Sequence, residues 1–260
     1  MSDLSIVYYT SNYLEGKNHY FLNNCKNQLI KATGGLPIIS VSQKPMNFGE
    51  NVCVGDIGRS HLNIYRQILV GCKAAKTKYV AMAEDDILYS VNHFLSPLID
   101  QEFTKHGDVF LYDMNKVSLF TWSKPPIFSF RTNRKVVNQL IAPRNMLIDA
   151  LEERFARLEV LTADMREKHP EIQNPEDKII KYWGDPGRYE NILGVTVRKS
   201  AEFYSWIPSI VFSHEYAYGY EFNQGKKKKH GDLRIRELCD WGRAEDIMRL
   251  YKEDHGRTTR

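Results

Sequence analysis

One segment constrains the fold more than any other: the apolar run Tyr79 to Ala83, which leads directly into Glu84, Asp85 and Asp86. A strand that is apolar on both faces is typical of the interior of a parallel sheet covered by helices. Three adjacent carboxylates repel one another, and a folded protein tolerates them best around a divalent cation. The segment therefore predicts a buried strand ending in a metal-binding loop, although the triplet alone is explained equally well by a solvated acidic turn.

The rest of the chain alternates between short apolar runs and helical periodicity. Further strands are predicted at residues 5–9, 37–41, 108–112 and 209–213. Apolar residues recur at helical spacing in 20–31, in 58–75 with Ser60 as a plausible N-cap, and from about Pro143 to Leu158. This order predicts an α/β fold with a mostly parallel sheet, right-handed crossovers and helices on both faces. In such sheets, ligands bind at the carboxyl ends of the strands.

Composition narrows the class of protein. The 260 residues are 42% hydrophobic and 26% charged, as in an ordinary globular protein that buries a core without disulfides. The four cysteines are far apart and form no CxxC pair, which argues against a zinc ribbon or a disulfide framework. No apolar run approaches the roughly 18 residues of a membrane span, and no signal peptide is recognisable. We expect a cytoplasmic protein with no membrane partner.

The C-terminal part has a different character from the rest. Four consecutive lysines at 226–229 are followed by spaced apolar residues, which predicts short helices packed on the sheet domain. We therefore divide the chain into a main domain, residues 1–222, and a basic helical extension, residues 223–260. The tail from Lys252 onward is expected to fray.

The stretch Arg59 to Ser90, RSHLNIYRQILVGCKAAKTKYVAMAEDDILYS, resembles the donor-site region of GT-A glycosyltransferases. In that family a helix precedes a buried strand that ends in a DxD-type motif, of which Glu84-Asp85-Asp86 resembles the EDD variant. The resemblance covers roughly residues 5–215 and implies a GT-A (Rossmann-like) fold and a nucleotide-sugar donor such as a UDP-sugar. It also implies Mn²⁺ or Mg²⁺ bound by Asp86, with Glu84 and Asp85 approaching the ribose or the sugar.

The chemistry of sugar transfer explains why such a motif would exist. Breaking the bond between a sugar and a nucleoside diphosphate puts negative charge on the departing phosphate, and a divalent metal stabilises that charge as a Lewis acid. A hard cation of this kind prefers oxygen ligands.

Two later residues have counterparts in the same family. Trp183 to Gly194, WGDPGRYENILG, resembles the WGxE-like segment whose acid contacts the acceptor or acts as the base in inverting members. Glu190 fits that role, but the segment departs from the common spacing, so Asp185 remains a competitor. His214 follows the strand at 209–213 and matches a late histidine that supplies an additional metal ligand, although a lone histidine is more often a bystander.

Four further residues are candidates for donor binding. Thr10, Ser11 and Asn12 end the first predicted strand, where GT-A folds hold the nucleotide base, and Arg59 at a helix start could meet a diphosphate. Turn chemistry explains the first three equally well, and a solvated surface position explains Arg59.

The acceptor is predicted from aromatic and basic residues near the C-terminus. Aromatic rings alternate along the chain just after His214 and precede a cationic run, a pattern that suits nucleic acid because bases stack while lysines neutralise phosphates. The residues concerned are Tyr216, Tyr218, Tyr220, Phe222, Lys226, Lys227, Lys228 and Lys229, with Arg234 and Arg236 beyond them. A solvated lysine loop beside core tyrosines is the alternative interpretation.

A second resemblance favours DNA as the acceptor. The pattern RSH…YRQIL…TKYVAMAEDDILYS is similar to glycosyltransferases found beside TET/JBP-type oxygenases in phage. Those enzymes decorate hydroxymethylated pyrimidines in DNA, which implies duplex DNA as partner and a host cytoplasm as location. A polysaccharide or a protein acceptor, a metal-dependent phosphoryl-transfer enzyme and a non-catalytic binding module remain alternatives. The absence of GxxxxGK[ST] excludes a P-loop NTPase.

Overall fold

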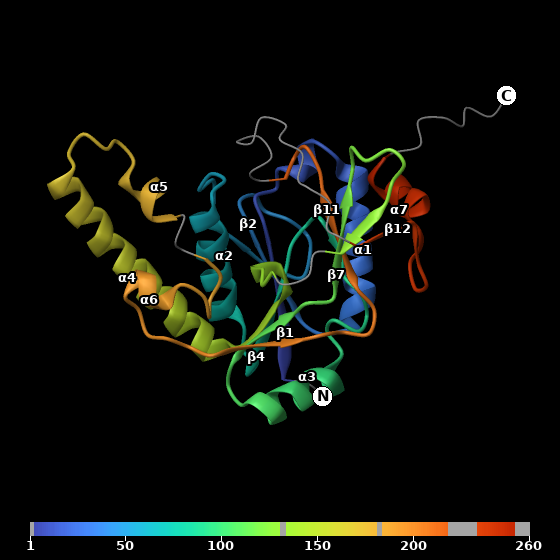
Figure 1. Cartoon of the computed structure of the whole chain (residues 1–260), viewed down its shortest axis with the longest axis horizontal. Coiled ribbons are helices and arrows are strands. Elements are labelled where there is room, and N and C mark those ends of the chain that lie inside the picture. Colours follow the sequence, from blue (N-terminus) through green and yellow to red (C-terminus); the bar gives the residue numbers. More distant parts are fainter. Residues whose placement is uncertain (1–2, 131–133, 181–183, 218–232, 253–260) are drawn as a thin grey trace.

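The computed structural model describes residues 3–130, 134–180, 184–217 and 233–252, and its largest feature is a seven-stranded sheet (Figure 1). The strands lie in the order β10 (Ser200–Phe203), β6 (Phe110–Asp113), β9 (Leu140–Pro143), β4 (Tyr79–Ala83), β1 (Leu4–Thr10), β2 (Ile38–Ser42) and β3 (Glu50–Cys53). Neighbouring strands are parallel except at β9, which is antiparallel to both β4 and β6. The predicted α/β fold with a mostly parallel sheet is confirmed.

Helices cover both faces of this sheet, as expected. On one face, α2 (His61–Ala74) and α4 (Arg144–Lys168) bury apolar side chains against Val7, Val80 and Met82. On the other, α1 (His19–Thr33) and α3 (Ser96–His106) pack against the alternate residues of the same strands. Every residue of β1 is buried, as expected of an interior strand that helices cover on both faces. Figure 1 shows α2 and α4 together on one side of β1 and β4, and α1 on the other.

Local sequence signals set the ends of the two helices beside the site. The predicted N-cap of α2 is confirmed, because Ser60 Oγ accepts a hydrogen bond from the Asn63 amide at 3.0 Å. Asn18 caps α1 in the same way, accepting from Phe21 N at 3.0 Å. Gly34 ends α1 in the left-handed conformation, with φ of 59°, which glycine adopts without steric cost.

A second sheet, which the sequence patterns did not reveal, packs across α1. Its strands lie in the order β12 (Arg234–Ile235), β8 (Phe128–Phe130), β7 (Lys116–Phe120), β11 (Ser209–Ser213) and β5 (Ile87–Leu88). Phe21 and Leu22 of α1 share a core with Val117, Leu119 and other residues of this sheet. The chain therefore passes from β4 in one sheet to β5 in the other through Glu84, Asp85 and Asp86.

The described C-terminal residues differ from the expected run of short helices. Residues 233–252 form β12, the hairpin β13 (Glu237–Leu238) and β14 (Gly242–Arg243), and the helix α7 (Ala244–Tyr251). Since β12 pairs with β8, this segment is hydrogen-bonded to the second sheet. The predicted division at 222/223 falls among residues 218–232, outside the described residues, as does the tail from residue 253. No described helix is long and apolar enough to cross a membrane.

The remaining helical segments are short and border the edge of the sheet where the site lies. They are the 3₁₀ turns Leu14–Gly16 and Val137–Gln139 and the helices α5 (Pro175–Ile180) and α6 (Glu190–Leu193).

Candidate active site

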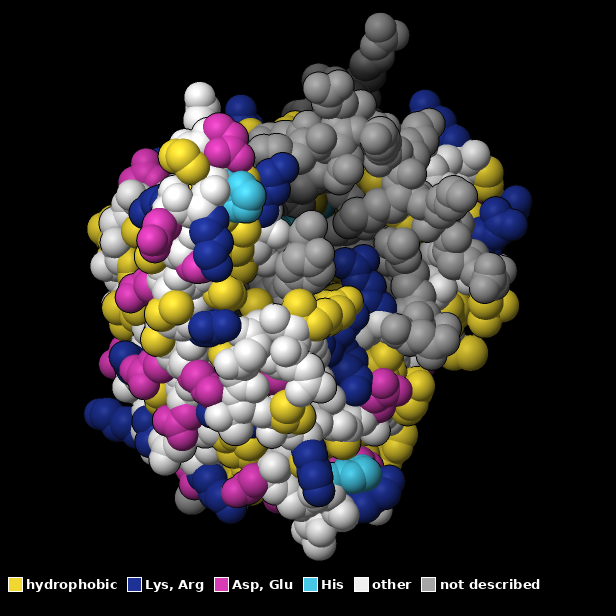
Figure 2. Space-filling view, turned by 60° about the vertical axis from the view of Figure 1, so that its left-hand side comes forward, with side chains coloured by type: hydrophobic (Ala, Val, Ile, Leu, Met, Phe, Trp, Pro, Cys, Tyr) yellow, Lys and Arg dark blue, Asp and Glu magenta, His cyan; other side chains and the backbone are white. Residues whose placement is uncertain are grey.

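A cleft of about 530 Å³ opens at the carboxyl ends of β1 and β4, where the α/β fold predicts ligand binding. Its size is within the range of ordinary ligand pockets. Figure 2 shows a hollow near the centre of one face of the molecule. Of the residues predicted as functional, the lining includes Thr10, Ser11, Arg59, Glu84, Asp85, Asp185, His214 and Tyr216.

The strand register explains why the acidic triplet meets the end of β1. Tyr8 lies opposite Ala83 in the parallel pair, so Tyr9 and Thr10 extend alongside Glu84 and Asp85. Tyr9 Oη donates to Glu84 Oε1 at 2.8 Å, and Thr10 Oγ1 donates to Asp85 Oδ2 at 2.5 Å. Two side chains of β1 therefore fix the first two carboxylates of the triplet.

Glu84 is the most constrained of the three carboxylates. Besides the Tyr9 hydroxyl, its second oxygen accepts a hydrogen bond from Asn138 Nδ2 at 2.6 Å. Burial and the neighbouring charge of Asp86 raise its pKa to about 8, although the hydrogen bonds from Asn138 and Tyr9 act in the opposite direction. Glu84 is thus held at the floor of the cleft.

Asp85 lies beside the side chain of Thr10. Burial and the charge of Asp86 raise its pKa to about 6, while the Thr10 hydrogen bond and His214 favour the ionised form. Both elevated pKa values have burial as their first cause, and both would fall if a cation were bound next to the carboxylates.

Asp86 faces His214 across the junction of the two sheets. In the β5–β11 pair, Val211 lies opposite Ile87, and Phe212 N donates to Asp86 O at 3.1 Å. This register brings His214 Nε2 to 3.3 Å from Asp86 Oδ2. The other carboxylate oxygen, Oδ1, is buried and has no hydrogen-bond partner among the described residues.

These residues fit a divalent cation in part. Cis ligands of an octahedral ion bound at about 2.1 Å lie about 3 Å apart, close to the observed spacing of Asp86 Oδ2 and His214 Nε2. A buried carboxylate oxygen without a partner is costly, and a bound cation would relieve that cost, as would a water. Among the described residues, however, no group of three His, Cys, Asp or Glu side chains is arranged around one point. The protein would therefore supply two ligands, and the other positions would remain for substrate or water.

The tautomer of His214 adds a condition for metal binding. Its Nδ1 accepts a hydrogen bond from Tyr216 N at 3.2 Å, so in the neutral ring the hydrogen is on Nε2, which faces Asp86. A ligating Nε2 must carry no hydrogen. Asp86 can bind a cation as it stands, whereas His214 can join only when the Tyr216 amide releases Nδ1.

The other predicted donor-site residues divide into two groups. Ser11 and Arg59 line the cleft, and Arg59 Nη2 donates to Tyr216 O at 2.7 Å while its guanidinium lies 3.8 Å from the Tyr13 ring centre. Asn12 does not line the cleft. Its Oδ1 accepts from the amides of Gln43 and Lys44 at 2.8 and 2.9 Å, which ties the ends of β1 and β2 together. Asn12 therefore shapes the cleft from behind.

Asp185 also lines this cleft. Its Oδ1 accepts from Tyr65 Oη at 3.2 Å, and Oδ2 is 3.4 Å from Arg188 Nη1. Burial raises the pKa of Asp185, and the Arg188 charge and the Tyr65 hydrogen bond only partly oppose this. A carboxylate with a raised pKa, open to a cleft and oriented by two partners, has the properties of a general base.

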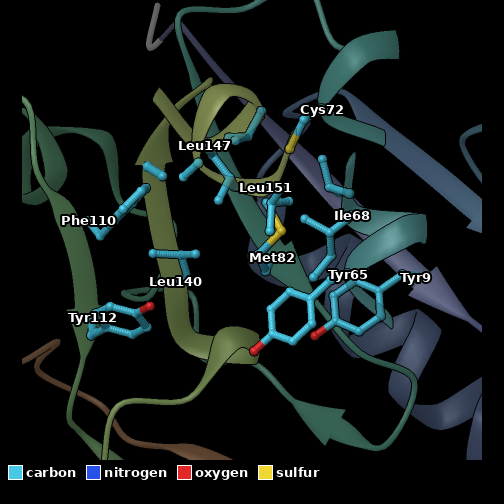
Figure 3. Packing of buried hydrophobic residues seen from close by; sticks show 14 of the residues in the cluster. Tyr9, Tyr65, Ile68, Cys72, Met82, Phe110, Tyr112, Leu140, Leu147 and Leu151 are labelled. Atoms are coloured by element: carbon cyan, nitrogen blue, oxygen red, sulfur yellow. The ribbon is translucent and has the colours of Figure 1, made fainter. Parts of the chain in front are cut away.

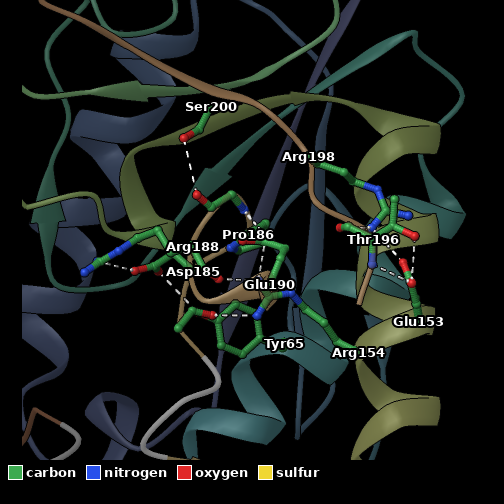
Figure 4. Close-up of polar contacts among 12 residues, drawn as sticks. Tyr65, Glu153, Arg154, Asp185, Pro186, Arg188, Glu190, Thr196, Arg198 and Ser200 are labelled. Atoms are coloured by element: carbon green, nitrogen blue, oxygen red, sulfur yellow. Dashed lines mark hydrogen bonds and ion pairs between the residues drawn. The ribbon is translucent and has the colours of Figure 1, made fainter. Parts of the chain in front are cut away.

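Glu190 is placed differently from its predicted catalytic position. It is buried and absent from the cleft lining, and its Oε1 accepts from Arg154 Nη2 at 2.7 Å and from Gly187 N at 2.6 Å. Arg154, 1% exposed on α4, also donates to the carbonyl of Arg188 at 2.7 Å. Figure 4 shows these contacts converging on the loop of residues 184–190. These contacts occupy the Glu190 carboxylate and tie it to the loop that carries Asp185.

The Arg154–Glu190 pair leads to a prediction about stability. Removing one member of a buried pair leaves the other charge uncompensated, which costs about 3–5 kcal/mol. We expect Glu190→Gln to lower the free energy of unfolding, measured with urea, by roughly that amount. The double variant Arg154→Met/Glu190→Leu should regain only part of the loss, because the Gly187 amide and the Arg188 carbonyl lose their hydrogen-bond partners. The exposed Lys73–Glu152 pair is the control, and Lys73→Met should change stability by less than about 1 kcal/mol. Wild-type stability in Glu190→Gln would contradict this prediction.

Lys116 of β7 is a buried cation that the sequence did not single out. Its Nζ has no hydrogen-bond partner among the described residues. Burial lowers the pKa of Lys116 to about 8, and the Asp113 charge only partly opposes this shift. The folded protein therefore loses this proton at a lower pH than the unfolded chain.

A pH dependence follows from Lys116. Between pH 8 and 10.5 the unfolded state binds more protons than the folded state, so this group makes the wild type more stable as pH rises. We expect Lys116→Met to raise the free energy of unfolding at pH 7, by up to about 3 kcal/mol. The difference in the free energy of unfolding between Lys116→Met and the wild type should shrink toward pH 10.5. Thermal unfolding of both proteins across this range measures the difference, and a constant offset would contradict the assignment.

Several predicted acceptor residues cannot be placed. Tyr218, Tyr220, Phe222 and the lysines at 226–229 lie outside the described residues. Tyr216 is described and lines the cleft, with its ring 6.5 Å from that of Tyr13 and 6.1 Å from that of His214.

Four residues of the site were not predicted from the sequence. Tyr9, Tyr65, Asn138 and Arg154 make the hydrogen bonds that fix Glu84, Asp185 and the loop of residues 184–190. A signal existed for one of them: Arg154 is seven residues after Leu147 and four before Leu158, which places it on the apolar face of α4.

Comparisons with known proteins give no family. No protein-family model matches the sequence, and no curated protein is similar to it at a significant level. Among solved structures, S. aureus TarS is similar with a TM-score of 0.44 and 10% identity over 83% of this chain and 37% of TarS. A truncated S. aureus TarS in complex with UDP-GlcNAc has a TM-score of 0.42 and 11% identity, over 83% of this chain and 59% of that one.

An enzyme of another class is equally similar. The CMP:2-keto-3-deoxy-manno-octonic acid synthetase complexed with CTP has a TM-score of 0.42 and 9% identity, over 78% of this chain and 91% of that one. The chain thus spans less than two thirds of either form of TarS. These likenesses are distant, with TM-scores below 0.5, and they show no function for this chain.

Proposed function

We propose that the protein is a metal-dependent glycosyltransferase that uses a nucleotide-sugar donor, as the resemblance of residues 59–90 implies. The observation that carries the proposal is the buried, unpartnered Oδ1 of Asp86. Asp86 does not itself line the cleft, but it lies between two residues that do, Asp85 in the chain and His214 across the junction of the sheets. A single carboxylate with an unused oxygen suits a cation that is shared with a diphosphate. Asp86 would hold the metal, and His214 would join it once Tyr216 N releases the ring.

The bound metal would supply Lewis-acid stabilisation of the departing diphosphate. The residues of the chain account for the rest of the donor site. Thr10 and Tyr9 hold Asp85 and Glu84 in fixed orientations, so the groups facing the donor are preorganised. Arg59 lines the same cleft beside Tyr13 and offers a second positive charge for the diphosphate.

Asp185 is the residue we assign to proton transfer in an inverting reaction. The acceptor hydroxyl would lose its proton to the carboxylate as the oxygen attacks the sugar carbon, and the bond from that carbon to the diphosphate oxygen would break. Tyr65 and Arg188 orient the carboxylate, and its raised pKa makes it a stronger base than an exposed aspartate. The carboxylate of Glu190, the other candidate for the base, forms an ion pair with Arg154.

Donor turnover tests the proposed function. The purified protein is incubated with a panel of nucleotide sugars and Mn²⁺, and the released nucleotide is identified with and without a chelator. We expect metal-dependent release of a nucleoside diphosphate from one donor, by slow hydrolysis when no acceptor is present. Release of a nucleoside monophosphate would instead indicate phosphoryl-transfer chemistry. Binding of metal and donor without any release would indicate a binding module.

For the acceptor we propose a 5-hydroxymethylated pyrimidine in duplex DNA, on the basis of the aromatic and basic residues that follow His214. Tyr216 at the cleft supports this, because an aromatic ring offers a face to a base. We expect binding of the protein to duplex DNA to fall steeply with salt, and replacement of residues 226–229 by serine to flatten that dependence.

Binding isotherms at several salt concentrations measure this effect. Serine replacement of Lys73 and Lys168, exposed lysines elsewhere on the surface, is the control and should leave the slope unchanged. Salt-independent or undetectable DNA binding, together with transfer to a simple saccharide, would contradict a DNA acceptor and indicate a carbohydrate acceptor.

A further inference from the structure

The end of the cleft around Asp185 contains more positive than negative charge. Arg134 and Arg188 both line it, against the single carboxylate of Asp185. Lys116 is buried and does not line the cleft, although its charge interacts with that of Asp185. We call Arg134 and Arg188 the basic end of the cleft. In Figure 2, Lys and Arg side chains gather along the wall of the hollow.

Neither guanidinium at the basic end is fully used by the protein. Arg134 is exposed, and no hydrogen bond or ion pair joins it to any residue that the structure describes. Arg188 is 33% exposed, and its contact with Asp185 is long, at 3.4 Å. Both guanidiniums therefore have N–H donors that an anion in the cleft could use.

The loop that carries Arg188 is rigid enough to form a binding site. Gly184 and Gly187 have φ of 56° and 82°. A Cβ at Gly184 would lie 2.3 Å from the Tyr189 ring, and a Cβ at Gly187 would lie 2.7 Å from Ser200 Cβ. Arg154 then fixes the carbonyl of Arg188 from below. Arg188 Nη1 also donates to Lys135 O at 3.1 Å. The guanidinium is therefore presented from a tightly packed turn, as Figure 4 shows.

The basic end is separate from the acidic triplet. Tyr9 and Tyr65 lie side by side in the same core, with the Tyr9 hydroxyl on Glu84 and the Tyr65 hydroxyl on Asp185 (Figure 3). Glu84 and Asp185 are thus held by the hydroxyls of two neighbouring tyrosines. An anion at the basic end would be bound by the two arginines, and a diphosphate would be bound through the metal at Asp86.

We propose that the basic end binds a phosphate group of the acceptor, so that the substrate class is a phosphate ester with a free hydroxyl. The inference rests on the proposed function, because it assigns the Asp86 end to the donor. Two guanidiniums present paired donors that suit phosphate oxygens. Bound there, the phosphate anchors the acceptor with its hydroxyl beside the Asp185 carboxylate.

The experiment measures phosphate and donor binding separately by calorimetry. The probes are glycerol 3-phosphate, the dinucleotide TpT, and UDP with Mn²⁺. Wild type, Arg134→Gln, the double variant Arg134→Gln/Arg188→Gln and the surface control Arg249→Gln are compared. We expect the double variant to bind the preferred phosphate ester at least about 10-fold more weakly, the single variant to be intermediate, and affinity for UDP with Mn²⁺ to stay within about 2-fold.

The two esters distinguish the source of the phosphate. Tighter binding of TpT indicates a phosphodiester chain such as nucleic acid, and tighter binding of glycerol 3-phosphate indicates a phosphomonoester. Either result supports the proposal if the double variant binds the preferred ester more weakly than the wild type does. Arg134→Gln has no described contact to break, so its effect is independent of folding.

Three outcomes would overturn the proposal. If both variants bind the esters as tightly as the wild type, the arginines do not form an anion site. If the double variant loses affinity for UDP with Mn²⁺ as much as for the ester, the arginines bind the donor and not the acceptor. Wild type that binds the ester but not UDP with Mn²⁺ contradicts the proposed function instead, and with it the assignment of the ester to an acceptor.

Discussion

Replacing Asp86 by asparagine should abolish metal-dependent turnover of the donor and leave the fold intact. The amide keeps the shape of the side chain but removes the charge that would hold the cation beside His214. Loss of several kcal/mol of charge stabilisation corresponds to a fall of roughly 1,000-fold or more in the rate of nucleoside diphosphate release. Thermal stability should stay equal or rise, because the substitution relieves repulsion from Glu84 and Asp85.

Asp246→Asn is the matched control for this substitution. Asp246 is an exposed aspartate on α7, paired only loosely with Arg249 at 3.4 Å, and its replacement should change neither rate nor stability. His214→Ala should weaken Mn²⁺ dependence in a graded way, since His214 is the second of two ligands. An Asp86→Asn variant that retains metal-dependent turnover would remove Asp86 from the metal site.

Asp185→Asn is expected to slow sugar transfer by about 100- to 10,000-fold without weakening the binding of donor or metal. The asparagine oxygen can still accept the Tyr65 hydrogen bond, so the loop should stay in place. The wild-type transfer rate should rise with pH through the raised pKa of Asp185, because only the deprotonated carboxylate accepts a proton. Single-turnover rates across a pH series measure both effects.

A comparison with Glu190→Gln separates catalysis from folding. Glu190 pairs with Arg154, so its substitution should lower stability, whereas Asp185→Asn should lower the rate in a stable protein. Near-normal transfer in Asp185→Asn, with an unchanged pH profile, would contradict a general base at this position and indicate a retaining mechanism.

The positions of the acidic triplet and of His214 could be predicted because they follow from local pattern. A run that is apolar on both faces has to be an interior strand, and the residues after it must lie at the edge of the sheet. The strand at 209–213 was equally clear, and His214 follows it directly. The contact between Asp86 and His214 depends on the pairing of β5 with β11. The strand β5 has only two residues and is too short to give a sequence signal.

Other elements could not be predicted because tertiary contacts define them. The strand β9 contains only Leu140 to Pro143, and Pro143 indicates a helix start as readily as a strand end. The sequence left the roles of Asp185 and Glu190 open because the segment 183–194 departs from the spacing of the family motif. The ion pair between Glu190 and the buried Arg154 of α4 is a tertiary contact that the local pattern does not show.

The central claim is that a cation and a nucleoside diphosphate bind at Asp86. The most direct test is a crystal of the protein grown with Mn²⁺ and UDP, with diffraction data collected at the manganese absorption edge. We predict one anomalous peak between Asp86 and His214, with the Tyr216 amide turned away from His214 Nδ1 and the diphosphate on the open side of the metal. A peak at another site, or UDP bound with no peak at Asp86, would contradict the account.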